Sequence, residues 1–460
     1  MKITGLTTYL VAPRWLFLKI DTDAGLVGWG EPVLEGHAET MAAKISELRE
    51  FMIGRNPLHI EDTWQAIYRN GCYRGGPVLM SAISGIDMAL WDIKGKYHNA
   101  PVHALLGGPV RDKVRSYCWI GGDRPTDLIA GAKALMTKGY DACKFNICEE
   151  LQIVDTNRKV DGIVRQLCDL RAAVGSDMDL AFDFHGRVHA PMARVLLREI
   201  EHLRPIFIED AVVSAQIDAM ADLARYTSIP LVIGERLHSR YDFKRVFETR
   251  AASVINPDPA HVGGISEMIR IGAMAEAYDV ALAPHCPLGP IALAACLQVD
   301  AVCHNAFIQE QSLGIHYNQG GDLTDYVTAT GGFTLSAGYL SIPQGPGLGI
   351  EVNEAYDVAL APHCPLGPIA LAACLQVDAV CHNAFIQEQS LGIHYNQGGD
   401  LTDYVTPTGG FTLSDGYLSI PQGPGLGIEV NEAYVIEAAA RGHAWRAPVW
   451  RHKDGSIAEW

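Results

Sequence analysis

The sequence has no long apolar run and no paired cysteine motif. Its apolar stretches extend over only a handful of residues, whereas a membrane-spanning helix needs about 20. The start of the chain has no sustained apolar segment followed by a small-residue cleavage site, so we expect no secretory signal. None of the eleven cysteines belongs to a CxxC pair or a zinc-like cluster. These absences favour reduced thiols in a cytoplasmic protein with no membrane partner.

Basic residues are also scarce. The 460 residues include 36 Lys and Arg against 53 Asp and Glu, which gives a formal net charge of -17. This balance argues against nucleic acid as a partner, because an acidic surface and a polyanion repel each other. The composition is otherwise that of a core-forming globular protein, with 48% hydrophobic and 19% charged residues. An acidic protein that binds a small anion is expected to need a cation in its site.

One long segment of the sequence occurs twice. Residues 276–353 recur as residues 354–431, with differences at only two of the 78 positions, where Ala329 corresponds to Pro407 and Ala337 to Asp415. Solenoid repeats are short, numerous and divergent, so a single near-identical copy does not predict a solenoid. It indicates a tandem duplication or an assembly error. Subtracting the 78 copied residues from 460 leaves a parent sequence of 382, whose fold we predict here.

From about residue 114 onward, short β-rich segments alternate with helical patterns that begin at polar caps and end near glycines. Six of the segments carry an ionisable residue at or near their end, and these residues recur every 23 to 27 positions: Asp183, Glu209, Glu235, Asp258, His285 and Glu310. With two earlier segments, the predicted strands are 116–121, 142–147, 180–185, 205–209, 231–235, 253–258, 281–285 and 306–310. Eight such units predict an α/β fold, a closed parallel (β/α)8 barrel whose active site lies at the carboxyl ends of the strands.

Three of those residues, Asp183, Glu209 and Glu235, end consecutive predicted strands. In a barrel they would converge, and unpaired carboxylates so close together would repel one another. A divalent cation removes that repulsion, and ligation by oxygen alone suits a hard ion such as Mg2+. The same acids could instead be surface salt-bridge partners, but their regular register favours a metal site.

The motifs around these residues resemble those of the enolase superfamily. Asp183, Glu209 within Phe-Ile-Glu-Asp, and Glu235 within Gly-Glu-Arg resemble its metal triad. His285 preceded by Asp258 resembles the mandelate racemase branch. The segments 28–31, 89–96, 183–187, 283–290, 309–312 and 445–460 are similar to acid-sugar dehydratases of that branch. The resemblance covers essentially the whole parent sequence.

This resemblance implies a domain organisation. Residues 1–113 would form an N-terminal α+β capping domain and residues 114–353 the barrel. Residues 354–431 would be an extra copy of strands seven and eight, and residues 432–460 a C-terminal segment that returns to the capping domain. The resemblance also implies one Mg2+ per subunit, a small-molecule acid-sugar substrate and a homo-oligomer.

The chemistry of proton abstraction suggests roles for further residues. A proton next to a carboxylate is a very weak acid, so its removal needs the developing negative charge to be stabilised, which bound Mg2+ would do. His285, oriented by Asp258, fits the base, and His185 fits the acid that protonates a departing hydroxyl. Glu310 could hydrogen-bond the enediolate if it is protonated, as the resemblance implies. The expected reaction is loss of water from an acid sugar to give a 3-deoxy-2-keto acid.

Position 146 favours elimination over racemisation. Racemases of the branch with Lys-x-Lys on the second strand would have lysine there, whereas this sequence reads Lys144-Phe145-Asn146 and so lacks a second base. The weaker candidates for substrate binding are His37, Tyr73, Arg74, Lys144, Asn146 and Asn256. The glycine-rich stretches near the first three are equally consistent with plain turns.

The duplication leaves two candidates for two roles. His363 is the counterpart of His285, and Glu388 is the counterpart of Glu310, but a closed eight-stranded barrel has room for one pair. We expect the first copy in the barrel, because it continues directly from the preceding helix and costs less loop closure. Two other functions stay open. One is a dehydratase, epimerase or racemase for another aldonate or hydroxy acid, and the other is a catalytically inactive product of the duplication.

Overall fold

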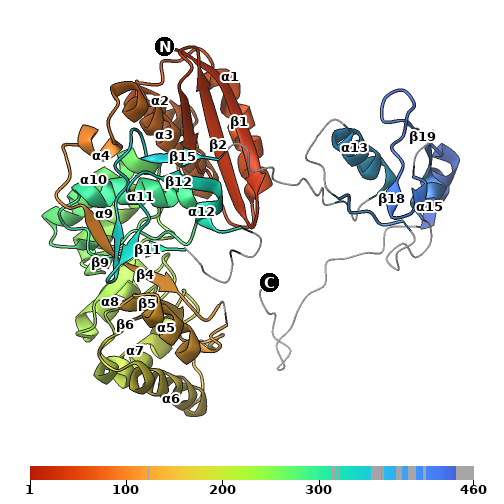
Figure 1. Ribbon diagram of the computed structural model, residues 1–460. Coiled ribbons are helices and arrows are strands. Elements are labelled where there is room, and N and C mark those ends of the chain that lie inside the picture. The colour runs from red at the N-terminus through yellow and green to blue at the C-terminus, as the bar shows by residue number, and fades with distance from the viewer. Residues whose placement is uncertain are drawn as a thin grey trace. The chain divides into compact units, whose positions relative to one another are not determined.

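The chain comprises two compact units, Met1–Tyr356 and Asp357–Trp460 (Figure 1). Its structure is a computed structural model that describes residues 1–122, 124–312, 318, 321–353, 364, 367–379, 386–391, 400–407 and 411–441. No helix in these ranges has both the length and the apolar character needed to cross a membrane.

The first unit begins with a small α+β domain, as the resemblance implied. Its antiparallel sheet has the order β1 (Ile3–Val11), β2 (Trp15–Thr22) and β3 (Val27–Gly30). Its helices are α1 (Ala38–Met52), α2 (Ile60–Arg69), α3 (Pro77–His98) and α4 (Val102–Leu105). Strand β3 lies so close to α3 that a Cβ on Gly28 would come within 2.1 Å of the Ala89 carbonyl oxygen, and one on Gly30 within 1.9 Å of Gly85 O. Only glycine allows this approach.

Eight parallel strands then form the predicted barrel. They are β4 (Lys113–Trp119), β5 (Ala142–Asn146), β6 (Asp179–Asp183), β7 (Phe207–Glu209), β8 (Leu231–Ile233), β9 (Val254–Ile255), β10 (Ala281–Leu282) and β11 (Gln309–Gln311). Each strand from β4 to β9 pairs with the next, β11 pairs with β4, and a bridge between Leu282 and Ala306 completes the ring. Each strand or its immediate flank contributes one residue to a central apolar cluster: Tyr117, Ala142, Ala181, Phe207, Val232, Val254, Ala283 and Ile308.

Helices connect the strands on the outside of the barrel (Figure 1). They are α5 (Leu128–Thr137), α6 (Asn157–Val174), α7 (Ala190–Ile200), the 3-10 turn η1 (Glu201–Leu203), α8 (Ile217–Tyr226), α9 (Arg240–Thr249), α10 (Gly264–Ala277) and α11 (Pro290–Val302). Several strands are shorter than the sequence predicts. Strands β9 and β10 end before Pro257 and Pro284, which have no backbone N–H to donate to the ladder. Asp258 and His285 therefore lie on the loops beyond the strands.

The first copy of the duplicated sequence completes the barrel and then contacts the N-terminal domain. After β11 come α12 (Leu323–Tyr326), β12 (Val327–Ala329), β13 (Leu335–Ser336), β14 (Tyr339–Ser341) and β15 (Ile350–Val352). Strand β14 pairs with β4, and the Tyr326 ring packs edge-on against Trp15 and Phe17 of β2. The Leu348 amide donates to Asp92 on α3 at 2.9 Å. Residues of the first copy thus form a return contact with the capping domain, whereas residues 442–460 of the predicted return segment lie outside the described ranges.

The second copy, drawn in blue in Figure 1, repeats the local structure of the first. Its elements are α13 (Pro368–Asp378), α14 (Leu401–Tyr404), β16 (Val405–Pro407), β17 (Leu413–Ser414), β18 (Tyr417–Leu418) and β19 (Ile428–Val430), followed by α15 (Glu432–Arg441). They enclose a small cluster of Cys364, Leu371, Ala372, Leu375, Leu401, Val405 and Phe411. The pairing of β16 with β19 repeats that of β12 with β15. The copied sequence therefore forms its helices, hairpin and ladder from local information.

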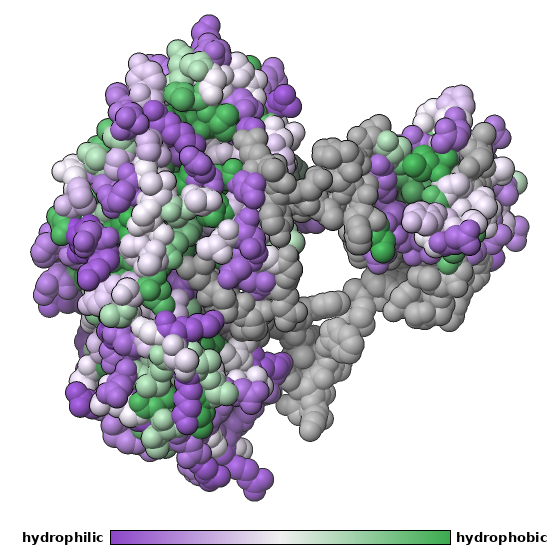
Figure 2. Space-filling view, in the orientation of Figure 1, coloured by the Kyte–Doolittle hydropathy of each residue, from purple (hydrophilic) through white to green (hydrophobic). Residues whose placement is uncertain are grey.

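The same helix sequence is buried to different extents in the two copies. Helix α11 is buried along its length from Pro290 to Ala301, whereas Leu371, Ala372 and Leu375 are the buried residues of α13. Apolar side chains of the second copy are correspondingly exposed, among them Ile386 at 61% and Leu413 at 62%. Figure 2 shows green, hydrophobic residues on the surface of this unit. Exposed apolar surface of this kind marks an aggregation risk.

Matched substitutions at Ile291 and Ile369 test this difference. Ile291 is fully buried on α11, and its counterpart Ile369 is 52% exposed on α13. We expect Ile291→Ala to lower the free energy of unfolding by about 2 to 5 kcal/mol, because it leaves a cavity in a packed core. Ile369→Ala should cost less than about 1 kcal/mol. Urea unfolding followed by circular dichroism measures both, and equal losses at the two positions would contradict the assignment of copy one to the barrel.

Candidate active site

The ionisable residues of the barrel meet at the carboxyl ends of its strands. Asp183 and Glu209 are the last residues of β6 and β7, Glu310 lies in β11, and Glu235 and His285 follow β8 and β10. A cavity of about 630 Å3 opens there. It is lined by Arg14, Leu34, Glu35, Trp119, Lys144, Asp183, His185, Glu235, Arg236, His238, His261, His285, Pro287 and Glu310. Five predicted site residues therefore share one cavity with Lys144.

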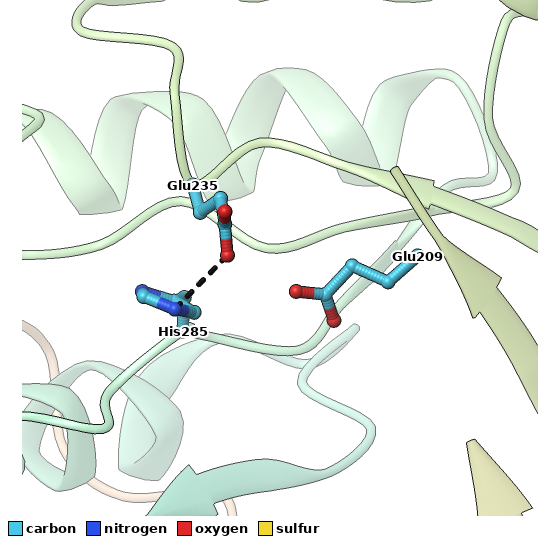
Figure 3. A group of neighbouring side chains, drawn as sticks. All are labelled: Glu209, Glu235 and His285. Carbon is cyan, nitrogen blue, oxygen red and sulfur yellow. Dashed lines mark ion pairs between the residues drawn. The ribbon is translucent and has the colours of Figure 1, made fainter. Parts of the chain in front are cut away.

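Glu209, Glu235 and His285 form the tightest group (Figure 3). One ligand atom from each lies within 4.8 Å of the other two. The His285 Nε2 atom is 3.0 Å from Glu235 Oε2 and 3.8 Å from Glu310 Oε2. The Glu209 carboxylate is fully buried, and Figure 3 shows it directed toward the other two side chains. Two carboxylates and an imidazole from the ends of β7, β8 and β10 thus converge.

Lys144 links two of the buried acids. Its ammonium group donates to the two carboxylate oxygens of Glu209 at 2.8 and 3.0 Å and lies 2.9 Å from Glu310 Oε1. The side chain is 3% exposed, so these ion pairs form almost without water. A buried carboxylate without a partner is strongly unfavourable, and Lys144 offsets part of that cost.

Asp183 contacts His185 rather than the central group. Its Oδ1 atom accepts from the His185 backbone N–H at 2.6 Å, and its Oδ2 lies 3.2 Å from His185 Nδ1. His185 lies just beyond β6 with φ of 51°, a left-handed conformation that turns the chain at the strand end. Asp183 therefore orients His185 toward the cavity that both residues line.

Asp258 and His285 form a second carboxylate–imidazole pair. Asp258 Oδ2 lies 2.7 Å from His285 Nδ1, and Asp258 is fully buried. A carboxylate on Nδ1 fixes the tautomer of the ring, so that Nε2 is the atom that faces Glu235 and Glu310 in the cavity. Asp258 Oδ1 also accepts from the Ala260 N–H at 2.7 Å, which fixes the carboxylate itself.

The local charges shift several pKa values in opposite directions. Burial lowers the pKa of His285, but Glu235, Glu310 and Asp258 outweigh it and hold that pKa well above its usual value. Burial likewise raises the pKa of Glu235, and the adjacent His285 and Arg236 reverse this and hold it well below its usual range. Burial and the surrounding carboxylates raise the pKa of Glu209 well above its usual range despite Lys144. The negative charges of these acids thus repel one another, and a further cation would reduce that repulsion.

The donor set and the unmatched polar atoms fit a divalent cation. Carboxylates with an adjacent imidazole suit a divalent metal. Among the described residues, neither amide atom of the fully buried Asn256 has a hydrogen-bond partner, and neither does Glu310 Oε2. A Cβ on Gly234 would come within 2.9 Å of Asn256 Oδ1, so glycine is needed beside Glu235. The residues that could hold the cation are Glu209 and Glu235 together with Asp183 or His285.

The remaining predicted residues are placed as follows. Asn146 is buried on β5 and donates to Gly122 O at 3.4 Å. His37, Tyr73 and Arg74 are exposed on the N-terminal domain and are not among the residues that line this cavity. In the second unit Glu388 accepts from the Cys364 N–H at 3.1 Å, and His363 lies outside the described residues.

Sequence patterns did not identify several residues that line the cavity, including Arg14, Glu35, Trp119 and His261. Arg14 and Glu35 lie in the N-terminal domain, which has no strand-end rule of the kind that the barrel follows. Arg236 directly follows the predicted ligand Glu235, and His238 lies three positions after it. This proximity in sequence was the signal that placed them near the site. Arg236 contacts both Asp210 and Glu235, so it balances acidic charge at the cavity wall.

Comparison with known protein families identifies both the N-terminal domain and the barrel. The mandelate racemase / muconate lactonizing enzyme N-terminal domain family matches residues 5–107. The enolase C-terminal domain-like family matches residues 127–356 and, separately, residues 352–434. The second match falls largely on the copied block.

Curated relatives and solved structures are similar over most of their length. A D-galactonate dehydratase of Ralstonia pickettii (strain 12J) is 48% identical over 460 residues, with 100% of each chain covered. One of Cronobacter sakazakii (strain ATCC BAA-894) is 56% identical over 364 residues, 79% of this chain and 95% of the relative. A crystal structure of an enolase superfamily member from Salmonella Typhimurium has a TM-score of 0.70 at 29% identity, covering 77% of this chain and 97% of its own. A mandelate racemase/muconate lactonizing enzyme-like protein from Roseovarius sp. TM1035 has a TM-score of 0.70 at 31% identity, with 77% and 94% covered. The chain therefore belongs to the enolase superfamily, in its mandelate racemase / muconate lactonizing enzyme family.

Proposed function

We propose that this protein catalyses the dehydration of D-galactonate to 2-dehydro-3-deoxy-D-galactonate, with Mg2+ as its divalent cation. The observation that carries the proposal is that two imidazoles, each oriented by a carboxylate, lie in one cavity. They are His185 and His285, and Asp183, Glu235 and Glu310 line the same cavity. The relatives named above, 48% and 56% identical, are D-galactonate dehydratases. They support this substrate over other acid sugars.

The chain's own groups account for the proton movements. His285 Nε2 takes the C2 proton, while Asp258 holds the ring through Nδ1 and stabilises the imidazolium that forms. Mg2+, when held by Asp183, Glu209 and Glu235, would neutralise the charge that develops on the substrate carboxylate. Lys144 can donate a hydrogen bond to this charge, and Glu310 can do so when its carboxyl group carries a proton.

Loss of the 3-hydroxyl completes the reaction. His185 gives a proton to that hydroxyl, which leaves C3 as water, and the electron pair from the C2–H bond forms the C2–C3 double bond. The resulting enol tautomerises to the 2-keto acid. Asp183 raises the pKa of His185 against the effect of burial, so the ring can carry the proton that it donates.

The substrate assignment is tested by Mg2+-dependent release of 2-keto-3-deoxy acid from D-galactonate. We expect turnover by the 460-residue chain and at least equal turnover by a version that lacks residues 354–431, because copy one completes the barrel. Turnover of a different aldonate in place of D-galactonate would overturn the substrate assignment but would still support dehydration as the reaction. Absence of turnover in both versions would overturn the proposed function.

Separate roles for the two histidines predict different isotope exchange. In D2O, His185→Asn should still exchange the C2 proton of D-galactonate but should release little ketoacid. His285→Asn should do neither, with each rate lowered by about 10²- to 10⁴-fold. Proton NMR of the substrate measures the exchange. His363→Asn is the matched control in the second copy and should retain activity, and loss of activity in this control would assign the base to copy two.

Metal binding distinguishes the two possible third ligands. We expect Asp183→Asn to weaken Mg2+ binding at least about tenfold, because Mg2+ prefers oxygen ligands in a regular octahedron. His285→Asn should change the dissociation constant by less than about threefold. Isothermal titration of the substrate-free protein with Mg2+ gives both values. The reverse order would place the imidazole, and not Asp183, among the metal ligands.

A further inference from the structure

The segment that follows His285 is held by the N-terminal domain. Glu31 directly follows β3 and is fully buried. Its carboxylate accepts from the Gly289 N–H at 2.7 Å and from the Ala292 N–H at 3.0 Å. Arg14, next to β2, donates to the Pro287 carbonyl oxygen of the same segment. Two charged residues of the capping domain therefore fix the chain between His285 and helix α11.

Glu31 matches what the beginning of a helix requires. The first N–H groups of α11 have no partner within the helix, and a carboxylate there satisfies them and interacts favourably with the helix dipole. Burial is the main cause that raises the pKa of Glu31 to about 7, so keeping this acid in the interior is costly. Glu31 is not among the residues that line the cavity, so a role in the reaction would be exerted through the residues that it contacts.

The contact depends on glycine at position 289. A Cβ there would lie 2.5 Å from Glu31 Oε1. The backbone is extended, with φ of -86° and ψ of -177°, and any residue can adopt that conformation. Glycine is thus required at position 289 because Glu31 leaves no space for a side chain, and not because the backbone is strained.

The second copy provides a natural control. Gly367 precedes α13 with nearly the same backbone conformation, φ of -82° and ψ of 175°, and the same neighbours in sequence. Among the described residues, no atom would lie within 4 Å of a Cβ at Gly367. The two positions therefore differ in the Glu31 contact and not in their local sequence.

We propose that Glu31 is a positioning residue for His285: it anchors the start of α11 to the capping domain and so holds the imidazole against Asp258. The role of His285 as the base rests on the proposed function. The anchor also favours copy one in the barrel, because the contact is made with Gly289 and Ala292 of that copy.

Four variants test the proposal through steady-state kinetics with D-galactonate. Glu31→Ala and Gly289→Ala should lower kcat at least about tenfold while KM and the Mg2+ requirement stay within about twofold, because the substrate-binding groups lie elsewhere. Glu31→Gln keeps one acceptor oxygen and should lose less than Glu31→Ala. Gly367→Ala should match the unchanged chain. A lower melting temperature with unchanged kcat for the first two variants would overturn the positioning role.

Amide exchange tests the anchor independently of activity. The peptides around 289 and 367 are identical, so Ile369→Val, at an exposed position, serves as a mass label for the second copy. In that background, Glu31→Ala should speed deuterium uptake at least about tenfold in the peptide that contains Gly289 and Ala292, and leave the labelled peptide unchanged. Equal uptake with and without Glu31 would overturn the proposal. If the unchanged chain has no activity on D-galactonate, the proposed function fails, and this exchange experiment alone decides whether the anchor exists.

Discussion

Four carboxylates share the mouth of one barrel, and their mutual repulsion is the constraint on which the site depends. Asp183, Glu209, Glu235 and Glu310 are 10% exposed or less, so water screens them little. Each has a positively charged or hydrogen-bonding partner in the structure. Lys144 links two of them, and His285 and Arg236 contact Glu235. The polar groups around the acids are thus arranged to keep negative charge where a divalent cation and an anionic substrate can meet.

Both domains of the first unit line the cavity around these acids. The barrel supplies the acids and imidazoles, whereas the capping domain closes the cavity with Arg14, Leu34 and Glu35. Close packing joins the parts: glycines on β3 allow that strand to lie directly on α3, and Gly289 leaves room for Glu31. These small residues carry no chemistry. They set the distances at which the chemical groups operate, and a single added methyl group would be felt in such a packed region.

The duplicated block shows how far local information extends. Two nearly identical segments form the same helices and the same short antiparallel ladders, so the sequence of the block suffices for these elements. Residues 387–389, the counterparts of β11, form no strand, because β11 depends on its pairing with β4. Only in the first copy does the leading helix become buried over its whole length. Burial, and with it most of the stabilisation, therefore comes from the neighbours that the rest of the barrel provides.

The sequence alone predicted the barrel, the family, and the acids and histidines at the strand ends. The regular spacing of the strand ends was sufficient to predict the barrel, because the parallel strands of a barrel bring their carboxyl ends to one rim. It did not determine strand lengths, since Pro257 and Pro284 end the ladder earlier than the apolar pattern does. It also did not reveal Arg14 or Glu31 as contacts of the segment after His285, because more than 250 positions separate these partners in the chain.

Tertiary structure decided which copy of strands seven and eight completes the ring, and it paired His285 with Glu235 and placed Lys144 against both Glu209 and Glu310. Such pairings depend on distances of a few ångströms between side chains from different strands. The spacing of residues along a chain fixes which strand end a group occupies, but packing fixes which neighbour it reaches.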